Sequence, residues 1–162
     1  MLVNDLNDEP LPLRAVPPRV LVADDNKLIR RITEALLISC GARVSLACNG
    51  IEALEQMATS SFDVALLDMR MPFVGGLQIV STARASPHDY KRLPTFVGMS
   101  ASPSNDLLEL CHQAGMSDFL CKPICKSDLD KGLVRWCYLA QRWMLDELEI
   151  ARGGRGVEQL TR

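Results

Sequence analysis

Short apolar runs alternate five times with longer stretches of helical periodicity from Arg19 onward. Leu28, Ile29, Ile32 and Leu36 recur at steps of three and four residues and predict a first helix that ends at Gly41, a residue typical of helix ends. Further helices are predicted over residues 51–57, from Gly75-Gly76 to near Pro87, from Ser104 to Gly115, and from Ser127 onward. The apolar runs between them are predicted strands, at residues 20–23, 43–47, 62–67, 95–99 and 118–121.

This strand and helix alternation is the signature of a parallel sheet. Residues 62–67 form an almost unbroken apolar run, which favours a strand buried on both faces by helices. The predicted fold class is therefore α/β, with five βα units making one doubly wound domain. The first 18 residues hold four prolines and no periodicity, so we expect a flexible leader there.

Composition narrows the class of protein. A chain of 162 residues with 48% hydrophobic content suits one soluble domain, and a net charge of -2 gives no footprint for direct binding to nucleic acid or an anionic membrane. No apolar run approaches the roughly 18 to 20 residues of a membrane helix, and the acidic N-terminus does not resemble a signal peptide. A cytoplasmic location is expected.

Six cysteines are spread through the apolar segments, and they are predicted to be free core thiols. Cys121 and Cys125 lack a nearby histidine that would complete a zinc site, and His88 and His112 are isolated. No metal is assigned to sulfur.

Polar residues stand where the predicted strands end. Asp24 and Asp25 follow the first strand, Asp68 the third, Ser100 the fourth and Lys122 the fifth. Ligands of open α/β sheets bind at these carboxyl ends. Asp68 alone is equally consistent with a turn aspartate, but three converging carboxylates would repel one another unless a divalent cation such as Mg²⁺ lay among them. The set could thus support a phosphoryl group on Asp68, with Mg²⁺ and Lys122 neutralising its oxygens and Ser100 donating a hydrogen bond.

The motifs Asp24-Asp25-Asn26, Asp68-Met69-Arg70-Met71-Pro72, Ser100-Ala101 and Lys122-Pro123 resemble the receiver domain of two-component response regulators, chemotaxis regulators included. The resemblance covers about residues 19–138 and is specific because four separate motifs match in order. It implies a flavodoxin-like fold with strand order 2-1-3-4-5, to which the apolar spacing beyond this segment adds an extended C-terminal helix.

The resemblance also implies roles for individual residues. Asp68 would be the phosphoacceptor, and Asp25, Asp68 and the backbone carbonyl of Arg70 would bind Mg²⁺ directly, with Asp24 acting through water. Lys122 would bind the phosphoryl group.

Two switch residues and one peptide bond follow from the same resemblance. Ser100 would be the switch hydroxyl, and Phe119 matches the aromatic residue that turns inward with it. Plain core packing is the alternative for Phe119. The bond between Lys122 and Pro123 is expected to be cis by analogy, although this is uncommon for X-Pro bonds in general.

The last predicted helix continues beyond the receiver segment. Leu129, Leu133, Trp136, Ala140 and Met144 recur at helical spacing, and Trp143, Leu145, Leu148 and Ile150 add apolar character. Either this segment pairs with a second copy or another protein, giving a homodimer in the first case, or it folds back onto its own domain. We expect a leader at 1–18, a receiver domain at 19–138, and a helix extension with a disordered Arg-Gly tail at 139–162.

The resulting hypothesis is a phosphoacceptor module of a phosphorelay that takes a phosphoryl group from a histidine kinase or a histidine phosphotransfer protein. It assists only its own phosphorylation and dephosphorylation, so no enzyme is predicted.

Alternatives are a receiver segment of a hybrid histidine kinase, or a degenerate receiver that acts as a binding module. An aspartyl-phosphate hydrolase fits less well because Arg70 stands where such enzymes place a second aspartate. A flavin or nucleotide module fits poorly because the Asp24-Asp25-Asn26 loop is acidic where a phosphate cradle needs glycines.

Overall fold

A computed structural model describes residues 16–152, with side chains as far as residue 141. Its five strands form one parallel sheet of order β2-β1-β3-β4-β5, which confirms the predicted flavodoxin-like fold. The strands are β1 (Arg19–Ala23), β2 (Arg43–Ala47), β3 (Val64–Asp68), β4 (Thr95–Ser100) and β5 (Asp118–Cys121). The helices are α1 (Lys27–Ser39), α2 (Gly50–Thr59), α3 (Gly76–Ala85), α4 (Asn105–Ala114) and α5 (Lys126–Arg152), with a short 3₁₀ turn at Pro87–Asp89.

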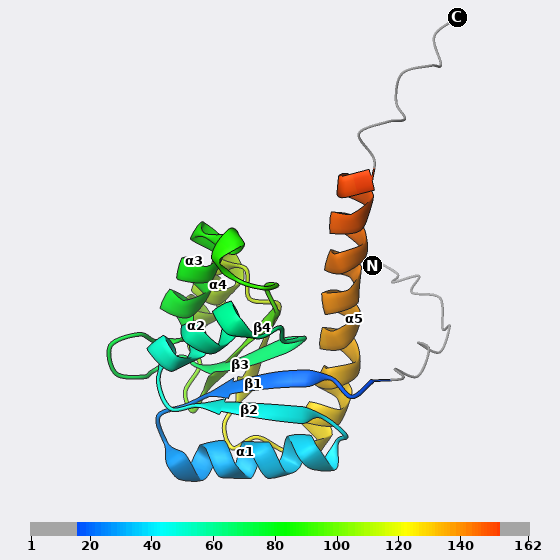
Figure 1. Ribbon diagram of the computed structural model, residues 1–162. Coiled ribbons are helices and arrows are strands. Elements are labelled where there is room, and N and C mark those ends of the chain that lie inside the picture. Colours follow the sequence, from blue (N-terminus) through cyan, green and yellow to red (C-terminus); the bar gives the residue numbers. More distant parts are fainter. Residues whose placement is uncertain (1–15, 153–162) are drawn as a thin grey trace, which may run out of the picture.

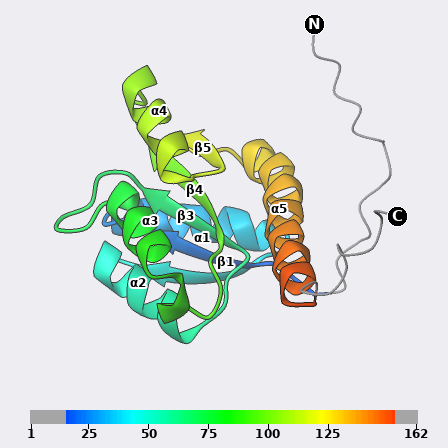
Figure 2. The same ribbon diagram turned by 90° about the horizontal axis from the view of Figure 1, so that it is seen from above.

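Helices cover both faces of the sheet (Figure 1, Figure 2). On one face α2, α3 and α4 bury a core that includes Met57, Ile79 and Phe96. On the other, α1 and α5 bury a second core that includes Leu37 and Trp136. The three central strands β1, β3 and β4 are buried from both sides, as the apolar run of β3 predicts, while the edge strands β2 and β5 are only partly buried. The sheet's carboxyl edge is thereby left as the place where polar side chains can gather.

Local sequence signals set where the helices begin and end. The side chain of Asn26 accepts hydrogen bonds from the backbone N–H groups of Leu28 and Ile29, and this cap starts α1. Ser104 caps α4 in the same way, and Gly115 ends α4 with a φ of 93°, a left-handed conformation that glycine adopts readily. The predicted start of α4 and its stop at Gly115 are confirmed.

The buried face of α1 differs from the pattern that predicted the helix. Leu28 and Ile32 are exposed at 68% and 50%, while Thr33 and Leu37 are buried. The helix itself is confirmed, because apolar side chains at steps of three and four residues favour it regardless of which face is covered. The side of α1 that packs against the sheet is the adjacent one, which carries Thr33 and Leu37. An apolar strip of α1 therefore lies on the surface.

Several predicted boundaries shift by a few residues. The third strand runs from Val64 to Asp68 rather than over residues 62–67, since Asp63 leaves the strand to accept hydrogen bonds from Arg19 and Arg92. The second helix is longer than predicted, and the last begins at Lys126, one residue before Ser127. Asp68 is consequently the last residue of its strand.

The last helix continues past the edge of the sheet (Figure 1). The predicted apolar stripe is buried at Leu129, Leu133, Trp136 and Ala140. The side chains of Met144, Trp143, Leu145, Leu148 and Ile150 lie outside the described part of the chain, as do residues 1–15 of the predicted leader and the predicted disordered tail from Gly153 on. The domain boundary at residue 138 therefore stays a prediction.

The six cysteines form no disulfides, as predicted, but the expectation of core positions is wrong for three of them. Cys48 lies in the loop after β2, while Cys121 ends the edge strand β5 and Cys125 follows it, so each is exposed. Among the described residues, no helix combines the length and apolar character needed to cross a membrane.

Candidate functional site

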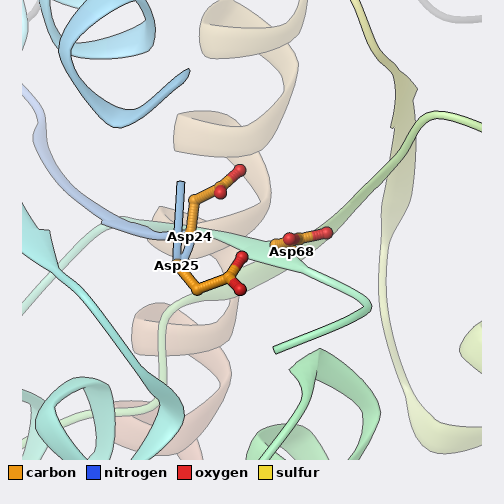
Figure 3. Close-up of side chains that lie close together, drawn as sticks. All are labelled: Asp24, Asp25 and Asp68. Atoms are coloured by element: carbon orange, nitrogen blue, oxygen red, sulfur yellow. The ribbon is translucent and has the colours of Figure 1, made fainter. Parts of the chain in front are cut away.

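Three aspartates meet at the carboxyl edge of the sheet. Asp24 and Asp25 follow β1, and Asp68 ends the adjacent strand β3, whose Leu67 pairs with Ala23 in register. One carboxylate oxygen from each of the three lies within 4.8 Å of the others (Figure 3). The predicted convergence of these residues is confirmed.

The backbone around β1 holds Asp24 in a fixed orientation. One of its carboxylate oxygens accepts a hydrogen bond of 2.8 Å from the backbone N–H of Asn26, and the Arg30 guanidinium donates to the Asp24 carbonyl at 2.6 Å. Asp24 is fully buried, whereas Asp25 is exposed. The cluster thus has a fixed inner carboxylate and an outer one open to solvent.

Lys122 supplies the positive charge of the site. Its ammonium nitrogen lies 2.5 Å from a carboxylate oxygen of Asp24 and 3.3 Å from one of Asp68. Three carboxylates and one ammonium leave a net charge of -2 when all are ionised, which a single divalent cation would neutralise. Carboxylate oxygens at this spacing are the donors that Mg²⁺ takes in proteins. The residues present therefore fit a magnesium ion.

Asp68 occupies an environment that disfavours its charge. Burial raises the pKa of its carboxyl group above the ordinary value, Lys122 opposes this shift, and the nearby Asp24 carboxylate adds to it. The backbone N–H of Arg70 also donates to Asp68 at 3.3 Å. A cation bound to Asp68 would offset the effects of burial and of Asp24, and would favour the ionised, nucleophilic form of Asp68.

The remaining predicted residues lie next to this cluster. Ser100 is buried at the end of β4, and its carbonyl accepts a 2.9 Å hydrogen bond from the backbone N–H of Lys122. Its hydroxyl oxygen accepts from the backbone N–H of Ser102 at 3.2 Å. The peptide bond between Lys122 and Pro123 is cis, as expected.

The ring of Phe119 packs against a glycine on the neighbouring strand. Phe119 pairs with Gly98, and a methyl group placed on Gly98 would come within 2.7 Å of the ring. The ring is half-buried and contacts the core beneath α3 and α4. This position agrees with plain packing as well as with a ring that moves, so the switch role stays a prediction.

Sequence reasoning missed Phe73, which lies in the loop after β3. Phe73 is 90% exposed, the highest value among the described large hydrophobic residues, and has a φ of 67°. In the sequence, only its position five residues after Asp68 could have pointed to Phe73, because an apolar pattern predicts neither the exposure of a side chain nor a left-handed backbone.

Comparison with known proteins places the site in context. The family described as response regulator receiver domain matches residues 20–133. The CAI-1 autoinducer sensor kinase/phosphatase CqsS of Vibrio cholerae is 38% identical over 118 residues, which are 73% of this chain and 17% of that protein. The sensor histidine kinase GacS of Pseudomonas protegens is 32% identical over 152 residues, 93% of this chain and 16% of that protein.

A solved structure resembles the chain as well. The receiver domain of the Pseudomonas aeruginosa sensor histidine kinase PA1611, which has a magnesium ion coordinated in its active-site cleft, is similar with a TM-score of 0.66 and 32% identity. The match covers 75% of this chain and 98% of that one. By contrast, the chain spans only about a sixth of the length of the two kinases above.

Proposed function

Because the chain belongs to the response regulator receiver domain family, we propose that it accepts a phosphoryl group on Asp68 from a phosphohistidine of a partner protein. The partner would be a histidine kinase or a histidine phosphotransfer protein, and the modified domain would change its interaction surface. The observation that carries this proposal is the cluster of Asp24, Asp25 and Asp68 with Lys122 at 3.3 Å from Asp68. The relatives named above are sensor kinases, so a segment of a hybrid kinase is the second form this function could take.

The proposed transfer is a single displacement at phosphorus. A carboxylate oxygen of Asp68 forms the new bond while the bond from phosphorus to the imidazole nitrogen breaks. The nitrogen keeps the electron pair of that bond and takes one proton from water, so the histidine leaves as a neutral imidazole. Lys122 stabilises the negative charge on the transferring oxygens, and Ser100 donates a hydrogen bond to one of them. The domain contributes only to reactions of its own Asp68, so it is not an enzyme with an external substrate.

Magnesium would complete the site. Asp25, Asp68 and the backbone carbonyl of Arg70 would hold it directly, with Asp24 acting through water. Bound there, the ion would neutralise phosphoryl oxygens during transfer. The net charge of the cluster supports this assignment, and the receiver of known structure described above has magnesium in the corresponding cleft.

The first experiment is phosphorylation by a small donor. Incubation with acetyl phosphate and Mg²⁺ is expected to add one phosphoryl group to the intact chain, as read by mass spectrometry, because the donor needs no docking partner. Asp68→Asn should show no gain, whereas Asp106→Asn, in the exposed first turn of α4, should be phosphorylated like the unsubstituted chain. An unmodified parent chain, or a modified Asp68→Asn variant, would contradict the proposal.

Magnesium binding can be tested without any phosphorylation. At ten times its dissociation constant, Mg²⁺ should raise the free energy of unfolding by about 1.4 kcal/mol, measured by urea denaturation. The exposed Asp25 contributes little to packing, so Asp25→Asn should fold normally yet lose most of this stabilisation. Equal stabilisation of both chains by Mg²⁺ would exclude Asp25 as a ligand.

A further inference from the structure

The loop between β3 and α3 presents one large apolar side chain to solvent. The loop's other apolar residues point inward: Met69 and Met71 are buried, and Val74 packs against the core. Phe73 alone is 90% exposed, and the loop projects beyond the sheet edge in both views (Figure 1, Figure 2). A single exposed apolar side chain is common on protein surfaces, so the exposure of Phe73 gains meaning only together with the backbone that presents it.

The backbone at Phe73 is strained and held in place. With a φ of 67°, Phe73 is the only described residue other than glycine with a positive φ, and it is the centre of a three-residue turn closed by a 2.8 Å hydrogen bond from Val74 N–H to the Pro72 carbonyl. The residues on either side of Phe73 are held by close contacts. A methyl group on Gly50 would clash with Val74, and one on Gly75 would clash with the Met69 carbonyl. Strain of this kind persists where neighbouring contacts impose it. The ring is thus presented from a pre-set backbone.

We propose that Phe73 is an apolar anchor for the protein that carries the phosphohistidine. This inference rests on the proposed function and adds the surface that recognises the donor. Five residues of chain cannot place Phe73 more than about 18 Å from Asp68. An interface of standard size covers about 800 Å² per partner, a disc of about 16 Å radius. The two lengths are comparable, so a donor centred over Asp68 is wide enough to reach this loop.

The burial of Asp68 means that a protein donor has to approach the loops around it closely. Its side chain is only 11% exposed, so a phosphohistidine has to enter the crevice and bring its own protein surface against the rim. Two further exposed apolar side chains lie near the site in sequence: Leu28 stands in the first turn of α1, and Ile51 follows Gly50, which lies close to Val74 of the Phe73 loop. The partner would be a protein that offers an apolar pocket for an aromatic ring beside its phosphohistidine.

Transfer rates from two kinds of donor test this inference. Purified phosphohistidine-carrying proteins of the same genome are each assayed as donors, and the fastest becomes the probe, with acetyl phosphate as the donor that needs no docking. Phe73→Ala should slow transfer from the protein donor on the order of 30-fold, the loss typical of a hot-spot side chain, and leave acetyl phosphate labelling within about twofold. Phe73→Leu should retain part of the rate. Val134→Ala, which removes another exposed apolar side chain, 58% exposed on α5, serves as the control and should be unaffected.

The outcomes separate the two proposals. Equal protein-donor rates for Phe73→Ala and the parent chain, or an equal loss in Val134→Ala, would overturn the anchor. If acetyl phosphate labels the chain but none of the tested proteins transfers its phosphoryl group, the anchor is overturned too, while the chemistry at Asp68 stays intact. Failure with every donor, acetyl phosphate included, would instead overturn the proposed function.

Discussion

Lys122→Met is expected to destabilise the metal-free protein by about 3–5 kcal/mol, because it leaves buried carboxylates without their counter-charge. Lys122 lies 2.5 Å from Asp24, whose side chain is fully buried, and 3.3 Å from Asp68. Urea denaturation in the presence of a chelator measures the loss. Added Mg²⁺ should recover part of it, since the ion would neutralise the same carboxylates.

The matched control is a lysine that forms an ion pair in solvent. Lys126 pairs with Asp130 at 2.7 Å, with about half of each side chain exposed, so Lys126→Met should cost far less than Lys122→Met. Similar losses for the two variants would show that Lys122 is no more than a surface charge.

The loss in Lys122→Met should also depend on pH. Lys122 lowers the pKa of Asp68, and burial and Asp24 raise it. Without the lysine the pKa of Asp68 in the folded state rises further above its unfolded value, so the folded chain binds more protons than the unfolded chain between those two values. The free energy of unfolding of the variant should therefore increase relative to that of the parent chain as the pH falls through the folded pKa of Asp68.

Trp136→Ala is expected to cost about 3–5 kcal/mol, the usual loss for a large aromatic side chain removed from a core. Trp136 is fully buried between α5 and the sheet. Its indole N–H donates to Asp118 at 2.7 Å, and its carbonyl accepts a hydrogen bond from the Thr95 hydroxyl at 3.0 Å. Urea denaturation followed by circular dichroism is the measurement.

A neighbouring aromatic residue on the same helix provides the control. Tyr138 is 42% exposed, so Tyr138→Ala should lose much less stability, while Trp136→Phe, which keeps a ring in the core, should fall between the two. If Trp136→Ala were as stable as Tyr138→Ala, the packing of α5 on the sheet would contribute little to the fold.

Much of the site could be predicted because parallel strands end at one edge of a sheet. Asp24, Asp68, Ser100 and Lys122 are far apart in sequence, yet each follows an apolar run, and the order of those runs fixed where they would meet. The cis bond before Pro123 came from resemblance to a family rather than from the physics of the chain. Its expected and observed forms agree.

Features that depend on side-chain neighbours could not be predicted. The spacing of Leu28 and Ile32 indicates a helix, but a helix's own residues do not say which stripe the sheet covers. The link from Trp136 to Asp118 joins residues whose separation carries no local signal. Phe73 has its exposed, left-handed position because close contacts at Gly50 and Gly75 confine the loop, and such contacts exist only in the folded chain.

The most direct test of Asp68 as the phosphoacceptor is to locate the modified residue. Borohydride reduction of the chain labelled with acetyl phosphate and Mg²⁺ converts an aspartyl phosphate to homoserine, which tandem mass spectrometry assigns to a position. We predict homoserine at position 68 and unmodified aspartate at positions 24 and 25. Homoserine at Asp24 or Asp25, or a phosphorylated chain with none at position 68, would contradict the account.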